Sequence, residues 1–95
     1  IMVARVIQYD FVPATRKVTL KNVQTVDVSR VQYIVNTTKG ITLYDYSDPS
    51  IGTITLDVNN VIILSHSTAR MVYTDELDIT YDFPIEPVDQ NRYFL

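Results

Sequence analysis

The stretch from Val31 to Tyr81 constrains the fold of this chain most, because runs of alternating apolar residues are separated there by turn-forming residues. Its best-defined piece, residues 52–66, reads GTITLDVNNVIILSH. Apolar residues recur at every second position in the first half of this piece, at Ile54, Leu56 and Val58. That period is typical of a strand with one buried face. Asn59-Asn60 tolerates the left-handed backbone of a type I′ turn, so the piece predicts a β-hairpin.

Alternation predicts strands over residues 2–9, 16–21, 23–28, 31–36, 41–45, 53–58 and 77–82. The four consecutive apolar residues at 61–64 predict a return strand that is covered on both faces or central in its sheet. In the strand over 31–36, Val31, Tyr33 and Val35 are expected on one face and the residues between them on the other. In the weaker strand over 23–28, Val26 and Val28 are expected to point inward. Residues 10–15 break the pattern, because Pro13 cannot donate to a sheet.

Seven or eight short strands with frequent turn signals are typical of a β-sandwich. The strands are expected to be antiparallel, because no helical period is long enough to form a parallel crossover. Ninety-five residues suit one domain, which we place at 1–82, followed by an extended C-terminal arm at 83–95. The chain has no cysteine, so neither a disulfide nor a thiolate metal site supplements its core.

Charge and hydropathy exclude some partners. The net charge of −3 argues against non-specific binding to nucleic acid, which needs clustered Lys and Arg. The apolar runs are too short for a membrane-spanning helix, so we expect no membrane partner. The first ten residues, IMVARVIQYD, include Arg5 and lack the apolar core of a signal peptide. We therefore expect a protein that stays in the cytosol or travels as part of an assembly.

The single histidine, His66, lies between Ser65 and Ser67. One interpretation is a general base, with Ser65 or Ser67 as the nucleophile. Neighbours in sequence rarely assemble a catalytic triad, and no G-x-S-x-G motif is present, so we interpret His66 as a loop residue. The acids form two groups without the spacing of an EF-hand, at Asp45, Asp48, Asp75, Glu76 and Asp78. We interpret them as outward-facing acids and predict no catalytic residue, no metal site and no cofactor.

Three further patterns have both a functional and a structural interpretation. Arg16, Lys17 and Lys21 form a small basic patch, which is more typical of a solvated strand face than of a nucleic-acid site. Tyr44 and Tyr46 flank Asp45 and would suit stacking on sugars or, alternatively, a structural framework. The run starting at Asn36, Asn-Thr-Thr, is a glycosylation sequon that matters only in a secreted eukaryotic protein.

The two ends hold more apolar residues than a lone domain requires. The strand over 2–9 is partly apolar on both faces, and residues 83–95, FPIEPVDQNRYFL, hold two prolines and no period. Burial of apolar surface contributes about 25 cal/mol per Å². We therefore expect partner contacts from Val3, Val6, Ile7, Tyr9, Phe83, Ile85, Tyr93, Phe94 and Leu95.

Three segments carry a family resemblance: RVQYIVNTTKGITLYD at 30–45, DPSIGTI at 48–54 and TDELDITYD at 74–82. In this order they resemble small β-sandwich virion proteins of tailed bacteriophages. The resemblance covers about half of the chain and implies a structural component of a capsid, neck or tail, with no functional residue carried over.

The first hypothesis is a capsid decoration or cement protein, located in the virion and assembled in the host cytoplasm. Its partners would be the major capsid protein or other virion proteins, and it would itself be a homo-oligomer. Two alternatives remain: an adaptor of the tail, neck, baseplate or fibre, and a carbohydrate- or receptor-binding module. We do not expect an enzyme.

Overall fold

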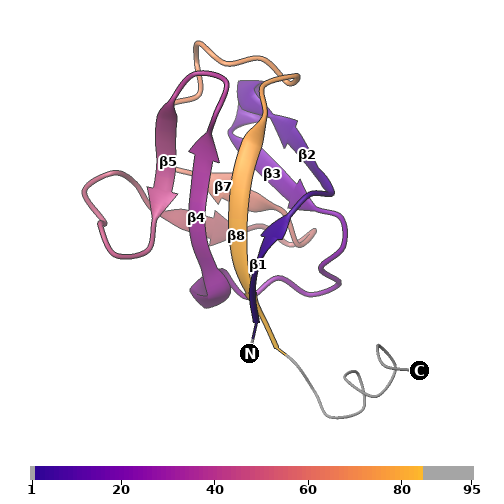
Figure 1. Cartoon of the computed structure of the whole chain (residues 1–95). Helices are drawn as coiled ribbons and strands as arrows, with labels where there is room; N and C mark the ends of the chain where they lie inside the picture. Colours follow the sequence, from indigo (N-terminus) through magenta and orange to yellow (C-terminus); the bar gives the residue numbers. More distant parts are fainter. Residues whose placement is uncertain (1, 85–95) are drawn as a thin grey trace.

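The computed structural model describes residues 2–84 of the protein (Figure 1). As the sequence predicts, these residues form an all-β fold of eight strands in two antiparallel sheets. The strands are β1 (Met2–Val6), β2 (Tyr9–Val12), β3 (Lys17–Leu20), β4 (Val31–Asn36), β5 (Ile41–Asp45), β6 (Ile54–Leu56), β7 (Ile62–Leu64) and β8 (Leu77–Phe83). The helical elements of this part of the chain are two single 3-10 turns, η1 (Pro13–Thr15) and η2 (Val28–Arg30). None of its helices could cross a membrane.

The two sheets face each other as the layers of a sandwich (Figure 1). The first sheet has the order β1-β8-β4-β5 and the second sheet has the order β2-β3-β7-β6. The chain therefore changes sheet after β1, β3, β5 and β7. Between the layers lies one apolar core whose completely buried members include Val6, Val18, Val31, Ile34, Leu43, Ile62 and Ile79.

The break predicted for residues 10–15 is wrong in its first half, because β2 runs from Tyr9 to Val12. The chain turns earlier, between Val6 and Tyr9, and crosses to the second sheet there. Phe11 is then buried opposite Val18 of β3. Pro13 begins η1, where its missing N–H is not needed.

The strand predicted over 23–28 is also wrong, because residues 21–27 form turns and loop. Side chains satisfy the backbone groups that a sheet would otherwise pair. The amide of Val26 donates to Oδ1 of Asn60 at 2.7 Å, and the amide of Asp27 donates to the hydroxyl of Tyr81 at 3.0 Å. Nδ2 of Asn60 in turn donates to the carbonyl oxygen of Gln24 at 3.1 Å. Val26 is buried as predicted, while residue 28 is half-buried at the start of η2.

In β4 the predicted alternation is lost at an irregularity. The register of β4 with β8 shifts between Val31 and Tyr33, where an extra residue is accommodated. Such a bulge moves the residues beyond it to the other face of the sheet. The buried residues are therefore Val31, Ile34 and Asn36, and Tyr33 is exposed.

The β6–β7 hairpin is confirmed, with Ile54 opposite Leu64, but its turn is not type I′. Asn60 has a positive φ of 65°, whereas Asn59 does not. The amide of Asn60 donates to the carbonyl oxygen of Asp57, as in a three-residue loop that ends in a left-handed residue. Val58 lies in this loop and is completely exposed, not inward as predicted. Leu56 is also exposed, because β6 is an edge strand.

Candidate functional site

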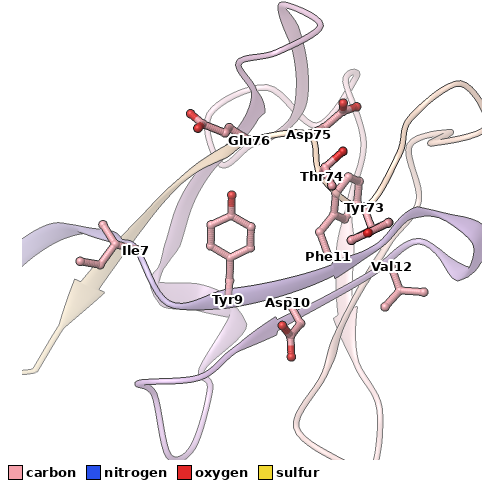
Figure 2. Close-up of a pocket in the computed structure, with 9 residues that line it drawn as sticks. All are labelled: Ile7, Tyr9, Asp10, Phe11, Val12, Tyr73, Thr74, Asp75 and Glu76. Carbon is pink, nitrogen blue, oxygen red and sulfur yellow. The ribbon is translucent and has the colours of Figure 1, made fainter.

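A hollow in the described part of the chain lies where the chain passes from β1 to β2. In the register of β1 with β8, Val6 is opposite Ile79, so the first residues of β8 extend past the end of β1. A groove of about 570 Å³ opens there between residues 7–12 and residues 73–76 (Figure 2). A smaller hollow of about 210 Å³ adjoins it through Ile7, Tyr9 and Glu76. We call the two hollows together the corner groove.

Tyr9 stands inside the corner groove. Its ring rises from β2 toward residues 75–76, with Ile7 on one side and Tyr73 and Thr74 on the other (Figure 2). The hydroxyl of Tyr9 accepts a hydrogen bond of 2.7 Å from the amide of Leu77. This bond satisfies a backbone donor of β8 at the place where β1 has left the sheet, and it fixes the ring in position.

Asp75 lines the groove but is buried, so the prediction that the acids face outward is wrong for this residue, and its role is structural. It is 5% exposed, and its Oδ2 accepts from Nδ2 of Asn36 at 3.0 Å and from the amide of Val72 at 3.3 Å. The hydrogen bond from Asn36 lowers the pKa of Asp75, the amide of Val72 and the charge of Lys39 add to this effect, and desolvation opposes it. Asp75 therefore holds the turn before β8 as an ion.

Glu76 and Asp78, which are close to Asp75 in the sequence, have surroundings different from those of Asp75. Glu76 is exposed at the edge of the groove, and Asp78 pairs with Arg5 at 3.5 Å. Asn36, the first residue of the sequon, is completely buried, so its amide is not accessible to modification in this fold.

Three exposed apolar residues line the corner groove, namely Ile7, Val12 and Tyr73, and a fourth, Val72, directly precedes Tyr73 in the sequence. Tyr73 is 77% exposed and Ile7 is 73% exposed, and Val12 and Val72 are about half exposed. We call these four residues the corner patch. An exposed apolar cluster of this kind marks a site of interaction more often than a scattered single residue does.

The structure separates the residues that the sequence predicts to contact partners. Val3 and Ile7 are exposed, and Tyr9 is half-buried in the groove. Val6 is completely buried in the core of its own chain, so it offers no surface to a partner in this fold. Phe83 is half-buried and packs edge-to-face on Tyr81, with ring centroids 5.0 Å apart. The remaining four, Ile85, Tyr93, Phe94 and Leu95, lie outside the described residues.

Sequence reasoning missed Val12, Val72 and Tyr73. A signal was present, because Val72 and Tyr73 are bulky apolar residues directly before the turn-forming run that starts at Thr74. Apolar residues in a connection between strands have no inward face assigned by alternation, so they are candidates for a surface contact.

The hydroxyls near His66 are engaged elsewhere. Nδ1 of His66 lies 2.8 Å from the carbonyl oxygen of Ser67, and Oγ of Ser65 accepts from the amide of Thr53 at 2.7 Å. The interactions of both side chains are thus with the backbone. Within residues 2–84, no three His, Asp or Glu side chains are grouped so that they could hold a metal ion.

The predicted basic patch is divided among separate partners. Lys17 pairs with Asp57 at 3.8 Å and Lys21 pairs with Asp10 at 3.2 Å. Nε of Arg16 donates to the carbonyl oxygen of Leu64 at 3.0 Å. The cations are therefore neutralised or engaged one by one and do not form a continuous positive surface.

The predicted tyrosine pair also separates. Tyr44 packs against the core, whereas Tyr46 is exposed. Tyr46 instead meets Tyr33 of β4, edge-to-face, with ring centroids 5.9 Å apart. The bulge in β4 that turns Tyr33 outward thus creates an aromatic pair that the sequence pattern does not predict.

Comparison of this chain with protein-family models, with curated proteins and with solved structures found no significant match.

Proposed function

We propose that this chain is a structural protein of a tailed-phage virion, and specifically a capsid decoration or cement protein that binds the outer surface of the shell. The observation that carries the proposal is the corner patch, which exposes four large apolar side chains at one end of a sandwich. The family resemblance of residues 30–82 supports the same proposal.

Burial of the corner patch against the shell supplies the binding free energy. Tyr73 and Ile7 are about three-quarters exposed, so most of their apolar area is available to a partner at about 25 cal/mol per Å². Each contact is modest, but a ligand that binds only the assembled state stabilises that state by mass action. Many copies on one shell would therefore raise its resistance to heat or to osmotic shock.

The test uses particles and full-length variants. Val72→Lys places a charge in the corner patch, and Val58→Lys places the same charge on a completely exposed residue of the β6–β7 turn. We expect Val72→Lys to lower the occupancy of the particle and Val58→Lys to leave it unchanged. Equal occupancy for both variants and the wild type would exclude the corner patch as the docking surface.

Copy number in purified particles separates the decoration protein from an adaptor of the neck, tail, baseplate or fibre. A decoration protein is present in hundreds of copies, whereas an adaptor is present in the few copies that the symmetry of the tail allows. Absence of the chain from purified particles would overturn both forms of the proposal.

The aromatic pair of Tyr33 and Tyr46 favours one further candidate, a carbohydrate- or receptor-binding module. Exposed aromatic rings stack on sugars, and Tyr46 is 57% exposed at the edge of the first sheet. Under this alternative, Tyr46→Ala abolishes binding to a glycan array, whereas Tyr44→Ala has a smaller effect because Tyr44 packs against the core.

A further inference from the structure

The corner groove has the character of a peptide-binding site. Its walls combine apolar and aromatic side chains, from Ile7, Tyr9, Phe11 and Tyr73, with the polar side chains of Asp10, Thr74 and Glu76. Its larger hollow, about 570 Å³, is within the range of roughly 300–1,000 Å³ that is typical of ligand pockets. The groove is open along the β1–β2 connection, so it suits an extended chain that inserts a few bulky side chains (Figure 2).

The groove also carries a negative charge that the described fold leaves unpaired. Glu76 is exposed at its edge and takes part in no ion pair within residues 2–84. Asp75 is committed to Asn36, and Asp10 lies 3.2 Å from Lys21. The matching ligand is therefore a segment with one cation beside several apolar residues.

The chain itself contains such a segment. Residues 92–95 read Arg-Tyr-Phe-Leu, a single cation followed by three bulky apolar residues. We propose that the corner groove of one copy binds residues 92–95 of a neighbouring copy, with Arg92 facing Glu76. The proposal goes beyond the proposed function, because it concerns contacts between copies and is tested on the free protein.

The direction of β8 favours the groove of a neighbour over the groove of the same copy. β8 begins beside the groove at Leu77 and ends at Phe83, at the other end of the molecule (Figure 1). The six residue-to-residue steps from Leu77 to Phe83 place these ends about 20 Å apart. Pro84 and Pro87 favour extended backbone, so the sequence predicts a segment that continues away from its own groove.

The reach of the segment is sufficient. The nine residues from 84 to 92 span up to about 30 Å when extended, which is enough to enter a second copy. The edges of β8 are occupied by β1 and β4, so no free sheet edge leads the segment back along β8. A segment that leaves one end of the molecule and a groove at the other end make a head-to-tail contact between copies. Such contacts close into a ring or continue as a chain.

The test mixes two full-length variants that are each defective in one half of the contact. The groove variant, Ile7→Lys, puts a cation into the groove at a residue that is 73% exposed and outside the strands. The segment variant combines Tyr93→Ser, Phe94→Ser and Leu95→Ser. We expect concentration-dependent oligomers of the wild type, monomers of each variant alone, and a one-to-one complex of the mixture by size-exclusion chromatography with light scattering.

The mixture distinguishes binding of residues 92–95 by a neighbouring copy from binding of these residues by the groove of the same copy. Failure of the two variants to combine, or a wild type that is monomeric at all concentrations, would overturn the proposal. Val58→Lys, which adds the same charge at a completely exposed site, is expected to associate like the wild type. Should Ile7→Lys not fold, as judged by circular dichroism, Tyr73→Lys replaces it, because Tyr73 is equally exposed and lines the groove.

A charge exchange tests the orientation of the segment. Glu76→Lys alone is expected to weaken association several-fold, and adding Arg92→Glu to the same chain is expected to restore it. A double variant as weak as Glu76→Lys would exclude the pairing of these two residues. Occupancy of particles is measured separately on Val72→Lys, so a failure of the exchange between copies leaves the test of the proposed function intact.

Discussion

The amide of Leu77, the first residue of β8, donates a hydrogen bond of 2.7 Å to the hydroxyl of Tyr9 on β2. This contact joins the two sheets at the corner where the chain crosses between them. A side-chain hydroxyl there replaces the strand partner that β1 provides farther along β8. Tyr9 thus satisfies the backbone of the first sheet where β1 is absent, and its ring also shapes the groove.

Tyr9→Phe is expected to open the start of β8 locally. The ring stays, but the amide of Leu77 loses its acceptor, and a typical hydrogen bond contributes about 0.5–1.5 kcal/mol. Hydrogen exchange of the Leu77 amide, measured by NMR, should become faster, while exchange in the middle of β4 stays unchanged. Unaltered exchange at Leu77 would contradict the assigned role of the hydroxyl.

Asn60 is expected to be sensitive both to loss of its amide and to loss of its conformational freedom. Asn60→Gly keeps the left-handed backbone but removes the contacts with Val26 and Gln24, which should cost about 1–3 kcal/mol. Asn60→Ala should cost about 1 kcal/mol more, because alanine is strained at a positive φ. Urea unfolding measures both, and an equal cost for the two variants would show that the backbone conformation is not limiting.

Ile79 is expected to be among the most sensitive core positions. It is completely buried, between Val6 of β1 and Ile34 of β4. Ile79→Ala should lower the free energy of unfolding by about 2–5 kcal/mol, by loss of burial and creation of a cavity. Val58→Ala, at a completely exposed residue, should change it by less than about 0.5 kcal/mol. Comparable losses in the two variants would contradict the placement of the core.

Asp75 is expected to make stability depend on pH in the acid range. Its pKa is lowered in the fold, mainly by the hydrogen bond from Asn36, so its ionised form is favoured by folding. Its contribution is present above the usual pKa of about 3.9 and is lost as the pH falls through the lower folded pKa. Asp75→Asn should therefore be less stable than the wild type at pH 7, and the difference should shrink as the pH is lowered.

Urea unfolding at a series of pH values from neutral to acid measures this difference. Asp10→Asn is the matched control, since its exposed pair with Lys21 contributes little and should give a small difference throughout. A constant deficit of Asp75→Asn at every pH would show that its effect does not come from the ionisation of Asp75. The pKa of Asp27 is also lowered, first by the side-chain hydrogen bond from Ser29, so both proteins should retain some loss of stability in acid.

Alternation and turn residues are enough to predict the fold class, the β4–β5 and β6–β7 hairpins and the strand β8. They fail where a side chain from a distant part of the sequence replaces a backbone partner. Residues 23–28 alternate like a strand, but Asn60 and Tyr81 supply their hydrogen bonds from over thirty residues away. A single sequence contains no local sign of such a partner.

In the candidate site, too, some features follow from local alternation in the sequence and others depend on contacts between distant residues. Val3 in β1 and Ile7 directly after β1 fall, by alternation, on the face opposite to the buried Val6, so their exposure follows from the sequence. The groove itself depends on how far β1 runs along β8, which is a matter of register between the two ends of the chain. The burial of Val6 and the outward turn of Tyr33 likewise depend on where the chain leaves a sheet and where a bulge falls.

The pairing of β1 with β8 has a consequence for the order in which the strands pair during folding. Residues 2–6 find their strand partner only at residues 79–83, so β1 cannot join the first sheet until β8 is in place. Contacts so distant in sequence slow folding, because the intervening loop must close before they form. The hairpins β2–β3, β4–β5 and β6–β7 are local and can form earlier. Addition of β1 to the first sheet is therefore expected to be a late step in folding.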